Sequence, residues 1–190
     1  GFESLMRWPG SEGRSPSEFI PAAESSGLIG ELGSWCLRQV MEDLRLLDGR
    51  GFTGFVSVNL SGRQLEDDRF VARLARLVHG KGVPTDRIHL EITETALVEN
   101  RDTARTAIDA LRLAGFRVAI DDFGTGYSSL ENLRDVQVDT IKLDRSYVKG
   151  IGRNPVDEAI VTAVLNLAQA MAVETIPEGV ETSEQRAFLL

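Results

Sequence analysis

The chain has 190 residues, of which 42% are hydrophobic and 26% charged, the composition of one ordinary globular domain with a hydrophobic core. The formal net charge of -8 at pH 7 argues against a surface that grips a nucleic-acid polymer, because such surfaces need clustered basic residues. The single cysteine excludes an internal disulfide, and no run approaches the roughly 18 consecutive apolar residues of a membrane helix.

Short apolar or β-branched runs predict six strands along the chain. They are GFESLMRW from Gly1, GFVSVNLS from Gly54, RIHLEITET from Arg87, FRVAIDDFG from Phe116, VDTIKLD from Val138 and VETIPEGV from Val173. Segments with helical spacing lie between them, at residues 33–47, 70–78, 104–111 and 160–168, and another helix begins near Ser183. This alternation predicts an α/β fold with a parallel sheet, and strands apolar on both faces predict a sheet covered on both sides. Cys36 is interpreted as part of the core packing of the first of these helices.

Each predicted strand has a polar residue at or near its C-terminal end. These residues are Glu3, Asn59, Glu91, Asp121 with Asp122, Lys142 and Glu178. A closed (β/α)8 barrel gathers such residues around one mouth, whereas an open doubly wound sheet spreads them along a crevice. We favour the barrel. Because six strands do not close one, we expect residues 1–190 to be a single domain that lacks one strand before Gly1 and another after Leu190.

Five of these strand-end residues are carboxylates, and neighbouring carboxylates raise one another's pKa unless cations lie among them. Lys142 and Arg7 cannot balance that many acids. A set of Asp, Glu and one Asn amide suits hard ions such as Mg²⁺ or Mn²⁺ rather than zinc. Two such ions roughly 3.5 to 4 Å apart are the usual arrangement for attack of water on a phosphodiester, and Asp121 and Asp122 could serve both ions.

Other readings of the same residues are less specific. A single acid after a strand is more often the N-cap of the next helix, so the metal prediction rests on repetition along the chain. His89 shares a strand face with Glu91 but is interpreted as filling an interior layer. The DFG sequence also occurs in protein kinases, but neither a glycine-rich G-x-G-x-x-G loop nor an H-R-D segment accompanies it.

Taken together, GFESLMRW, NLS, EITET, DDFGTGYSSL, DTIKLDRSYV and EGVET resemble the EAL-domain cyclic di-GMP phosphodiesterases, in this order and from near the first residue to near the last. The resemblance implies a modified TIM-like (β/α)8 barrel with one antiparallel strand, two Mg²⁺ or Mn²⁺ ions, and hydrolysis of cyclic di-GMP to linear pGpG. A non-catalytic cyclic di-GMP receptor is the alternative, which the intact acids disfavour. A dimerisation or regulatory module without a ligand is a third possibility.

The resemblance also implies a ligand set for each ion. The first ion would be surrounded by Glu3, Asn59, Glu91 and Asp121. The second ion would be surrounded by Asp121, Asp122 and Glu178. Lys142 would hold the attacking water and, with Glu3 and Glu178, complete the catalytic set. Either Glu178 or a hydroxide on the metal would serve as the base, and the sequence does not choose between them.

Further roles implied by the resemblance concern the substrate and a loop. Arg7, Asp144 and Glu181 would contact the substrate, with Arg7 reaching a phosphate. Glu94 would stabilise the loop that follows Asp122, a loop that in the family also contributes to dimerisation. This loop contains Gly124, Thr125 and Gly126.

Departures from the family pattern and the expected context complete the sequence-based view. Ser4 replaces the Ala of the Glu-Ala-Leu signature, which should leave activity intact, and Pro177 removes a backbone donor from what should be an interior strand. A glutamine-glycine motif of the family's last strand would lie beyond Leu190, so the isolated piece should be unstable or inactive. We expect a homodimer within a longer cytoplasmic protein, fused to sensor or GGDEF-type domains, and tethering of that longer protein to a membrane is left open.

Overall fold

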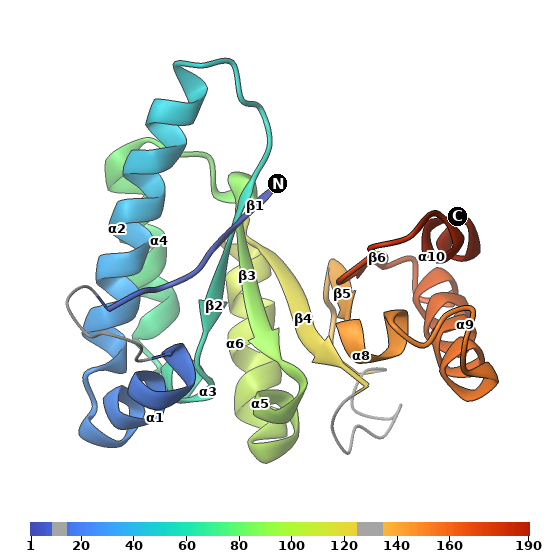
Figure 1. The fold of residues 1–190 in the computed structure, drawn as a ribbon. Helices are drawn as coiled ribbons and strands as arrows, with labels where there is room; N and C mark the ends of the chain where they lie inside the picture. Colours follow the sequence, from blue (N-terminus) through green and yellow to red (C-terminus); the bar gives the residue numbers. More distant parts are fainter. Residues whose placement is uncertain (9–14, 125–134) are drawn as a thin grey trace.

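The computed structural model describes residues 1–8, 15–124 and 135–190, which form part of a barrel (Figure 1). In this part of the chain six strands form one sheet, ordered as they follow in the sequence, and every adjacent pair is parallel. They are β1 (Phe2–Ser4), β2 (Val56–Leu60), β3 (Ile88–Thr93), β4 (Arg117–Phe123), β5 (Thr140–Leu143) and β6 (Glu174–Pro177). All six predicted strands and the incomplete barrel are confirmed. The antiparallel strand implied by the resemblance is not among these six.

Helices connect the strands. They are α1 (Pro16–Ser26), α2 (Ile29–Asp48), α3 (Gly62–Leu65), α4 (Phe70–Lys81), α5 (Glu94–Glu99), α6 (Arg101–Leu113), α8 (Arg145–Val148), α9 (Pro155–Ala170) and α10 (Ser183–Leu189), with a 3-10 turn at Thr85–Arg87. The five predicted helices correspond to α2, α4, α6, α9 and α10, whereas the sequence does not predict α1 or the short helices α3, α5 and α8. Within the described residues, no helix has the length and apolar character needed to cross a membrane.

The two faces of the sheet differ in chemistry, because successive side chains of a strand point to opposite sides. The face packed against the helices is apolar, and its fully buried members include Ile88, Leu90, Ile92, Ile120, Ile141 and Leu143. The concave face carries Ser57, Asn59, His89, Glu91, Asp121, Thr140 and Lys142. The prediction of strands that are apolar on both faces is therefore wrong for the concave face, where polar side chains line the interior of the barrel.

An irregularity in β4 falls at the two adjacent acids. Ile120 lies opposite Ile141 and Phe123 opposite Leu143, so three steps along β4 match two along β5. This extra residue is a β-bulge, and it places both Asp121 and Asp122 against the stretch of β5 that holds Lys142. Asp122 accordingly has a φ of 54°, in the left-handed region that few residues other than glycine adopt.

Two interpretations of interior residues are confirmed. Cys36 is buried in α2, where burial raises the pKa of its thiol and its Sγ lies 3.7 Å from Ser4 Oγ. Ser4 thus points toward the helices, away from the face that carries Glu3. His89 is buried on the concave face, with its ring stacked on Phe55 at a centroid distance of 3.6 Å.

Candidate active site

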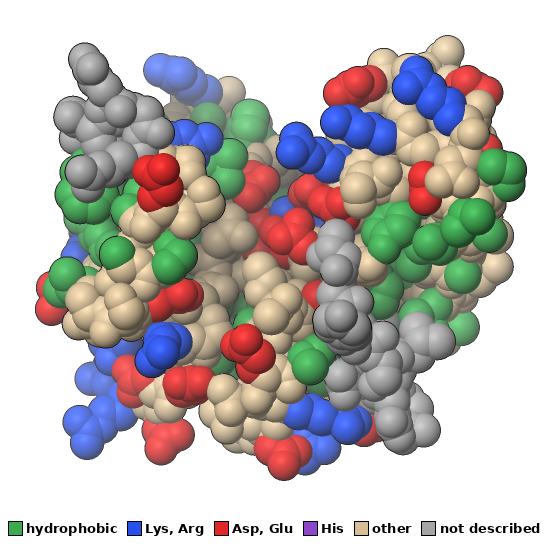
Figure 2. All heavy atoms as spheres, turned by 60° about the horizontal axis from the view of Figure 1, so that its bottom comes forward, with side chains coloured by type: hydrophobic (Ala, Val, Ile, Leu, Met, Phe, Trp, Pro, Cys, Tyr) green, Lys and Arg blue, Asp and Glu red, His purple; other side chains and the backbone are tan. Residues whose placement is uncertain are grey.

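The polar residues at the strand ends meet at the edge where the parallel strands finish. Figure 2 views this edge and shows acidic side chains gathered in a hollow near the centre of the molecule. Carboxylate oxygens of Glu3, Glu91 and Asp121 all lie within 4.8 Å of one another, a spacing that lets three groups hold one metal ion. Asn59 completes this part of the site, since its Nδ2 donates to Glu3 Oε1 at 3.0 Å.

Lys142 lies at the centre of the acidic cluster. Its Nζ is 3.0 Å from oxygens of both Glu91 and Asp121, 2.9 Å from Glu178 Oε1 and 3.9 Å from Glu3 Oε2. Burial opposes the charged form of Lys142 most strongly, but the hydrogen bond to Glu178 and the charges of Glu91 and Asp121 raise its pKa well above the ordinary value. One ammonium cannot neutralise four carboxylates, so the cluster keeps an excess of negative charge.

Two acids at this site, Glu91 and Asp122, have raised pKa values, with burial as the main cause. Burial raises the pKa of Glu91, which is 3% exposed, and the charges of Asp121 and Glu3 add to the effect while Lys142 opposes it. Burial also raises the pKa of Asp122, followed by the charges of Asp121, Asp144 and Glu178. Neighbouring carboxylates repel one another, and a bound divalent cation would reduce this repulsion. The atoms that these carboxylates offer to a metal are all oxygens, the ligands that hard cations prefer.

The backbone after the acidic pair is held by a buried acid. Glu94 begins α5, is 2% exposed, and accepts the N–H of Gly124 at 2.6 Å. The loop-stabilising role of Glu94 and Gly124 stays a prediction, and Thr125 and Gly126 lie outside the described residues. A second contact holds the same residue, since the Tyr147 hydroxyl donates to the carbonyl of Gly124. The sequence did not predict this contact.

The three expected substrate residues form hydrogen bonds with neighbours that are not part of the cluster. Arg7 is exposed and donates to the Met6 carbonyl at 2.9 Å. Asp144 caps α8, accepting the Ser146 N–H at 2.9 Å. Burial of Asp144 is outweighed by its hydrogen bonds from Ser146, so its pKa is lowered. Glu181 is exposed, and its backbone N–H donates to Gln185 Oε1 at 2.8 Å.

Pro177 fits its strand without the loss of a hydrogen bond to β5. Glu174 donates its N–H to Asp139 and Glu178 donates to Leu143, both at 3.0 Å. Since donors alternate along a strand, the nitrogen of Pro177 lies on the side of β6 that faces away from β5. The residue that follows it, Glu178, reaches Lys142 at 2.9 Å.

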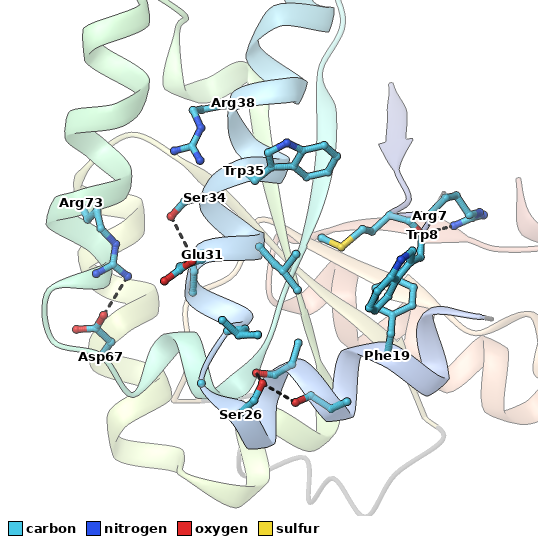
Figure 3. Close-up of a pocket in the computed structure, with 17 residues that line it drawn as sticks. Arg7, Trp8, Phe19, Ser26, Glu31, Ser34, Trp35, Arg38, Asp67 and Arg73 are labelled. Atoms are coloured by element: carbon cyan, nitrogen blue, oxygen red, sulfur yellow. Dashed lines mark hydrogen bonds and ion pairs between the residues drawn. The ribbon is translucent and has the colours of Figure 1, made fainter. Parts of the chain in front are cut away.

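A large apolar cavity lies beside Arg7, between the segment that follows β1 and helices α1 and α2 (Figure 3). Its volume is about 1080 Å³, and its lining includes Arg7, Trp8, Phe19, Trp35 and Arg38. The two tryptophans are about half exposed, at 54% for Trp8 and 49% for Trp35, and Trp8 packs edge-on against Phe19. Sequence reasoning did not find this cavity because α1, which forms one wall, was not predicted.

Comparisons with known proteins agree with these observations. The family model described as "EAL domain" matches residues 1–190. A relative from Escherichia coli K12, named cyclic di-GMP phosphodiesterase PdeR, is 38% identical over 189 residues, which are 98% of this chain and 29% of the relative. A Pseudomonas aeruginosa relative, cyclic di-GMP phosphodiesterase PA2567, is 33% identical over 97% of this chain. The chain spans less than a third of the length of both relatives.

Solved structures share the fold. The PaMucR phosphodiesterase in complex with c-di-GMP superposes with a TM-score of 0.89 at 33% identity, and covers 98% of this chain and 77% of its own. Klebsiella pneumoniae BlrP1, in a manganese and cy-diGMP complex, superposes with a TM-score of 0.83 at 31% identity, and covers 98% of this chain and 47% of its own.

Proposed function

The chain belongs to the EAL domain family, and from this membership and the geometry of its acidic cluster we propose that it hydrolyses cyclic di-GMP to linear pGpG with two divalent metal ions. The observation that carries the proposal is the convergence of Glu3, Glu91 and Asp121 around Lys142. Four carboxylates around one ammonium form a poor site for an anionic substrate by themselves, but a good one for divalent cations that can then receive a phosphodiester.

The proposed ligands fit two ions. Glu3, Asn59, Glu91 and Asp121 would hold the first, and Asp121, Asp122 and Glu178 the second. The bulge in β4 supports this division, because it sets two consecutive acids, Asp121 and Asp122, opposite the part of β5 that holds Lys142. When bound, Mg²⁺ or Mn²⁺ ions lower the pKa of water and neutralise charge on phosphoryl oxygens.

Side chains of the chain itself would supply the remaining chemistry. The Lys142 ammonium would donate a hydrogen bond to the attacking water and orient it, and its ion pairs with Glu91, Asp121 and Glu178 support this role. Glu178 is the most accessible of these three carboxylates, with its side chain 30% exposed, so we propose that it accepts the proton of that water.

The cavity beside Arg7 supports a nucleotide substrate. Guanidinium groups suit phosphate oxygens, and indole rings offer flat surfaces to a nucleobase. Both kinds of group line this cavity, since Arg7 and Trp8 follow β1 directly and Trp35 comes from α2. We propose that a guanine base of cyclic di-GMP lies in this cavity while its phosphodiester faces the acidic cluster.

The proposal extends to the assembly. Since the chain spans less than a third of its curated relatives, we propose that it works within a longer protein that carries sensor or GGDEF-type domains and that forms a homodimer. Activity should therefore be measured on the longest native protein that contains these residues.

The test is a hydrolysis assay with cyclic di-GMP and Mn²⁺, in which pGpG is followed by mass spectrometry. Wild-type protein should form pGpG. Asp121→Asn should slow the reaction by about 10²-fold or more, equivalent to roughly 2.7 kcal/mol of activation free energy. Asp43→Asn, which removes an exposed acid of α2, is the matched control and should react like wild type. Equal rates for all three proteins would contradict the proposed metal site, and binding without hydrolysis would favour the receptor alternative.

A further inference from the structure

The residue that follows the acidic end of β4 is held from two sides. The N–H of Gly124 donates to Glu94 on α5, and its carbonyl accepts the hydroxyl of Tyr147 on α8. Helix α5 follows β3 and helix α8 follows β5, so the helix after each strand beside β4 contributes one side chain to the same backbone residue. Gly124 is therefore fixed relative to both neighbours of the strand that carries Asp121 and Asp122.

The backbone at this point needs such support. Asp122 has a φ of 54° and Gly124 a φ of 98°, both in the left-handed region. Residues other than glycine rarely adopt this conformation, and they keep it only where the surrounding structure imposes it. Because the direction of the Asp122 side chain follows from this backbone conformation, contacts that hold Gly124 also hold the carboxylate of Asp122.

Tyr147 is well placed to give this support. Its ring packs against the hydrophobic core, and a Cβ built on Gly124 would lie 2.9 Å from Tyr147 Cε2, so ring and backbone are in close contact. Helix α8 is itself anchored, since Asp144 caps its first turn and the buried Gln185 donates from Nε2 to the Val148 carbonyl at 3.1 Å. The hydroxyl thus projects from a fixed helix.

We propose that Tyr147 is a positioning residue for the second metal ion, holding Asp122 in its ligating direction through the carbonyl of Gly124. The inference rests on the proposed two-ion function and adds a residue to it. Tyr147 acts only through the backbone, so the first ion, held by Glu3, Asn59, Glu91 and Asp121, should be insensitive to its hydroxyl. Glu94 holds the same residue from the other side, so loss of the hydroxyl should loosen the second site rather than destroy it.

The test compares Mn²⁺ binding to wild type and Tyr147→Phe by titration calorimetry, with electron paramagnetic resonance to detect coupling between neighbouring ions. The native protein that contains these residues is used, without substrate. Loss of one hydrogen bond should weaken the second binding step roughly two- to tenfold and leave the first unchanged. Thr106→Ala is the matched control, because it also removes a hydroxyl that donates to a backbone carbonyl, on the exposed face of α6. It should bind both ions like wild type.

Activity provides an independent reading. Tyr147→Phe should hydrolyse cyclic di-GMP more slowly at limiting Mn²⁺ and approach the wild-type kcat when Mn²⁺ is in excess. If Tyr147→Phe binds two Mn²⁺ ions and the second binds as tightly as in wild type, the inference about Tyr147 is overturned while the proposed function stands. Equal weakening of both steps would also overturn it, since the hydroxyl would then act on the whole site. A wild-type protein that binds no second Mn²⁺ would overturn the proposed function together with the inference.

Discussion

Replacement of Lys142 by Met tests whether one ammonium stabilises the acidic cluster. Met has a similar length but carries no charge. In the folded protein the Lys142 Nζ lies 3.0 Å from carboxylate oxygens of Glu91 and Asp121 and 2.9 Å from Glu178. Removal of one partner of a buried ion pair costs about 3 to 5 kcal/mol of unfolding free energy. We expect about 3 kcal/mol, the low end, because water screens the partly exposed Glu178.

The loss should depend on pH in a defined direction. Burial already raises the pKa of Glu91 above its ordinary value of 4.5, and removal of Lys142 takes away the main opposing charge. The folded variant then keeps protons that the unfolded chain releases, so its stability falls as the pH rises from 4.5 through the raised pKa. In wild type, the raised pKa of Lys142 has a separate effect, because its stabilisation is complete below 10.5 and lost only above that value.

The assay is urea unfolding followed by tryptophan fluorescence at pH 8 and pH 4, with a chelator present to remove divalent ions. Lys149→Met, which removes an exposed lysine at the end of α8, is the control and should change stability by less than about 0.5 kcal/mol. The reasoning would be refuted if Lys142→Met matched wild type at pH 8, or if it lost as much stability at pH 4 as at pH 8.

Two further predictions concern other residues. Gly124→Ala should weaken Mn²⁺ binding and slow hydrolysis at least about tenfold, because its φ of 98° strains any side chain and the new methyl meets the Tyr147 ring. Gly80→Ala, in α4 with open space around it, is the control, and a calorimetric melt should show it slightly stabilised. Cys36 should resist a colorimetric thiol reagent until the protein unfolds, because burial raises its pKa; rapid labelling of the folded protein would contradict this.

Most of the fold could be predicted because the face of each strand under the helices is apolar. Val56, Val58 and Leu60 alternate with polar residues along β2, for example, and such runs mark strands without knowledge of their partners. Helix α1 could not be predicted in the same way, since it contains Pro21 and buries only Phe19 and Ala23. Its stability depends on packing against α2 rather than on a local pattern. Single-turn helices such as α8 are too short to have a periodic pattern.

The candidate site could be located, but not its internal contacts. Parallel strands finish at one edge, so a polar residue at each strand end was enough to bring Glu3, Glu91 and Asp121 together. The sequence could not show that Lys142 contacts all three, nor that Arg7 lies outside the cluster, because neither follows from spacing along the chain. The bulge in β4 was also invisible, since it is defined by its register with β5.

Asp144 shows the limit of reading single acids. An acid after a strand is more often a helix cap than a ligand, and Asp144 does cap α8 through the Ser146 N–H. The same rule applied to Asp121 would have been misleading, because Asp121 lies within 3.0 Å of Lys142 instead. Only the arrangement of neighbouring strands distinguishes the two positions.

The central claim, that the acidic cluster holds two metal ions, is tested most directly by anomalous X-ray diffraction at the manganese edge. Crystals of the native protein would be grown with Mn²⁺ and a slowly hydrolysed cyclic di-GMP analogue. We predict two anomalous peaks roughly 3.5 to 4 Å apart, with the Asp121 carboxylate within ligand distance of both. Absence of manganese from the cluster, with the Lys142 ammonium still bonded to Glu91, Asp121 and Glu178, would contradict the account.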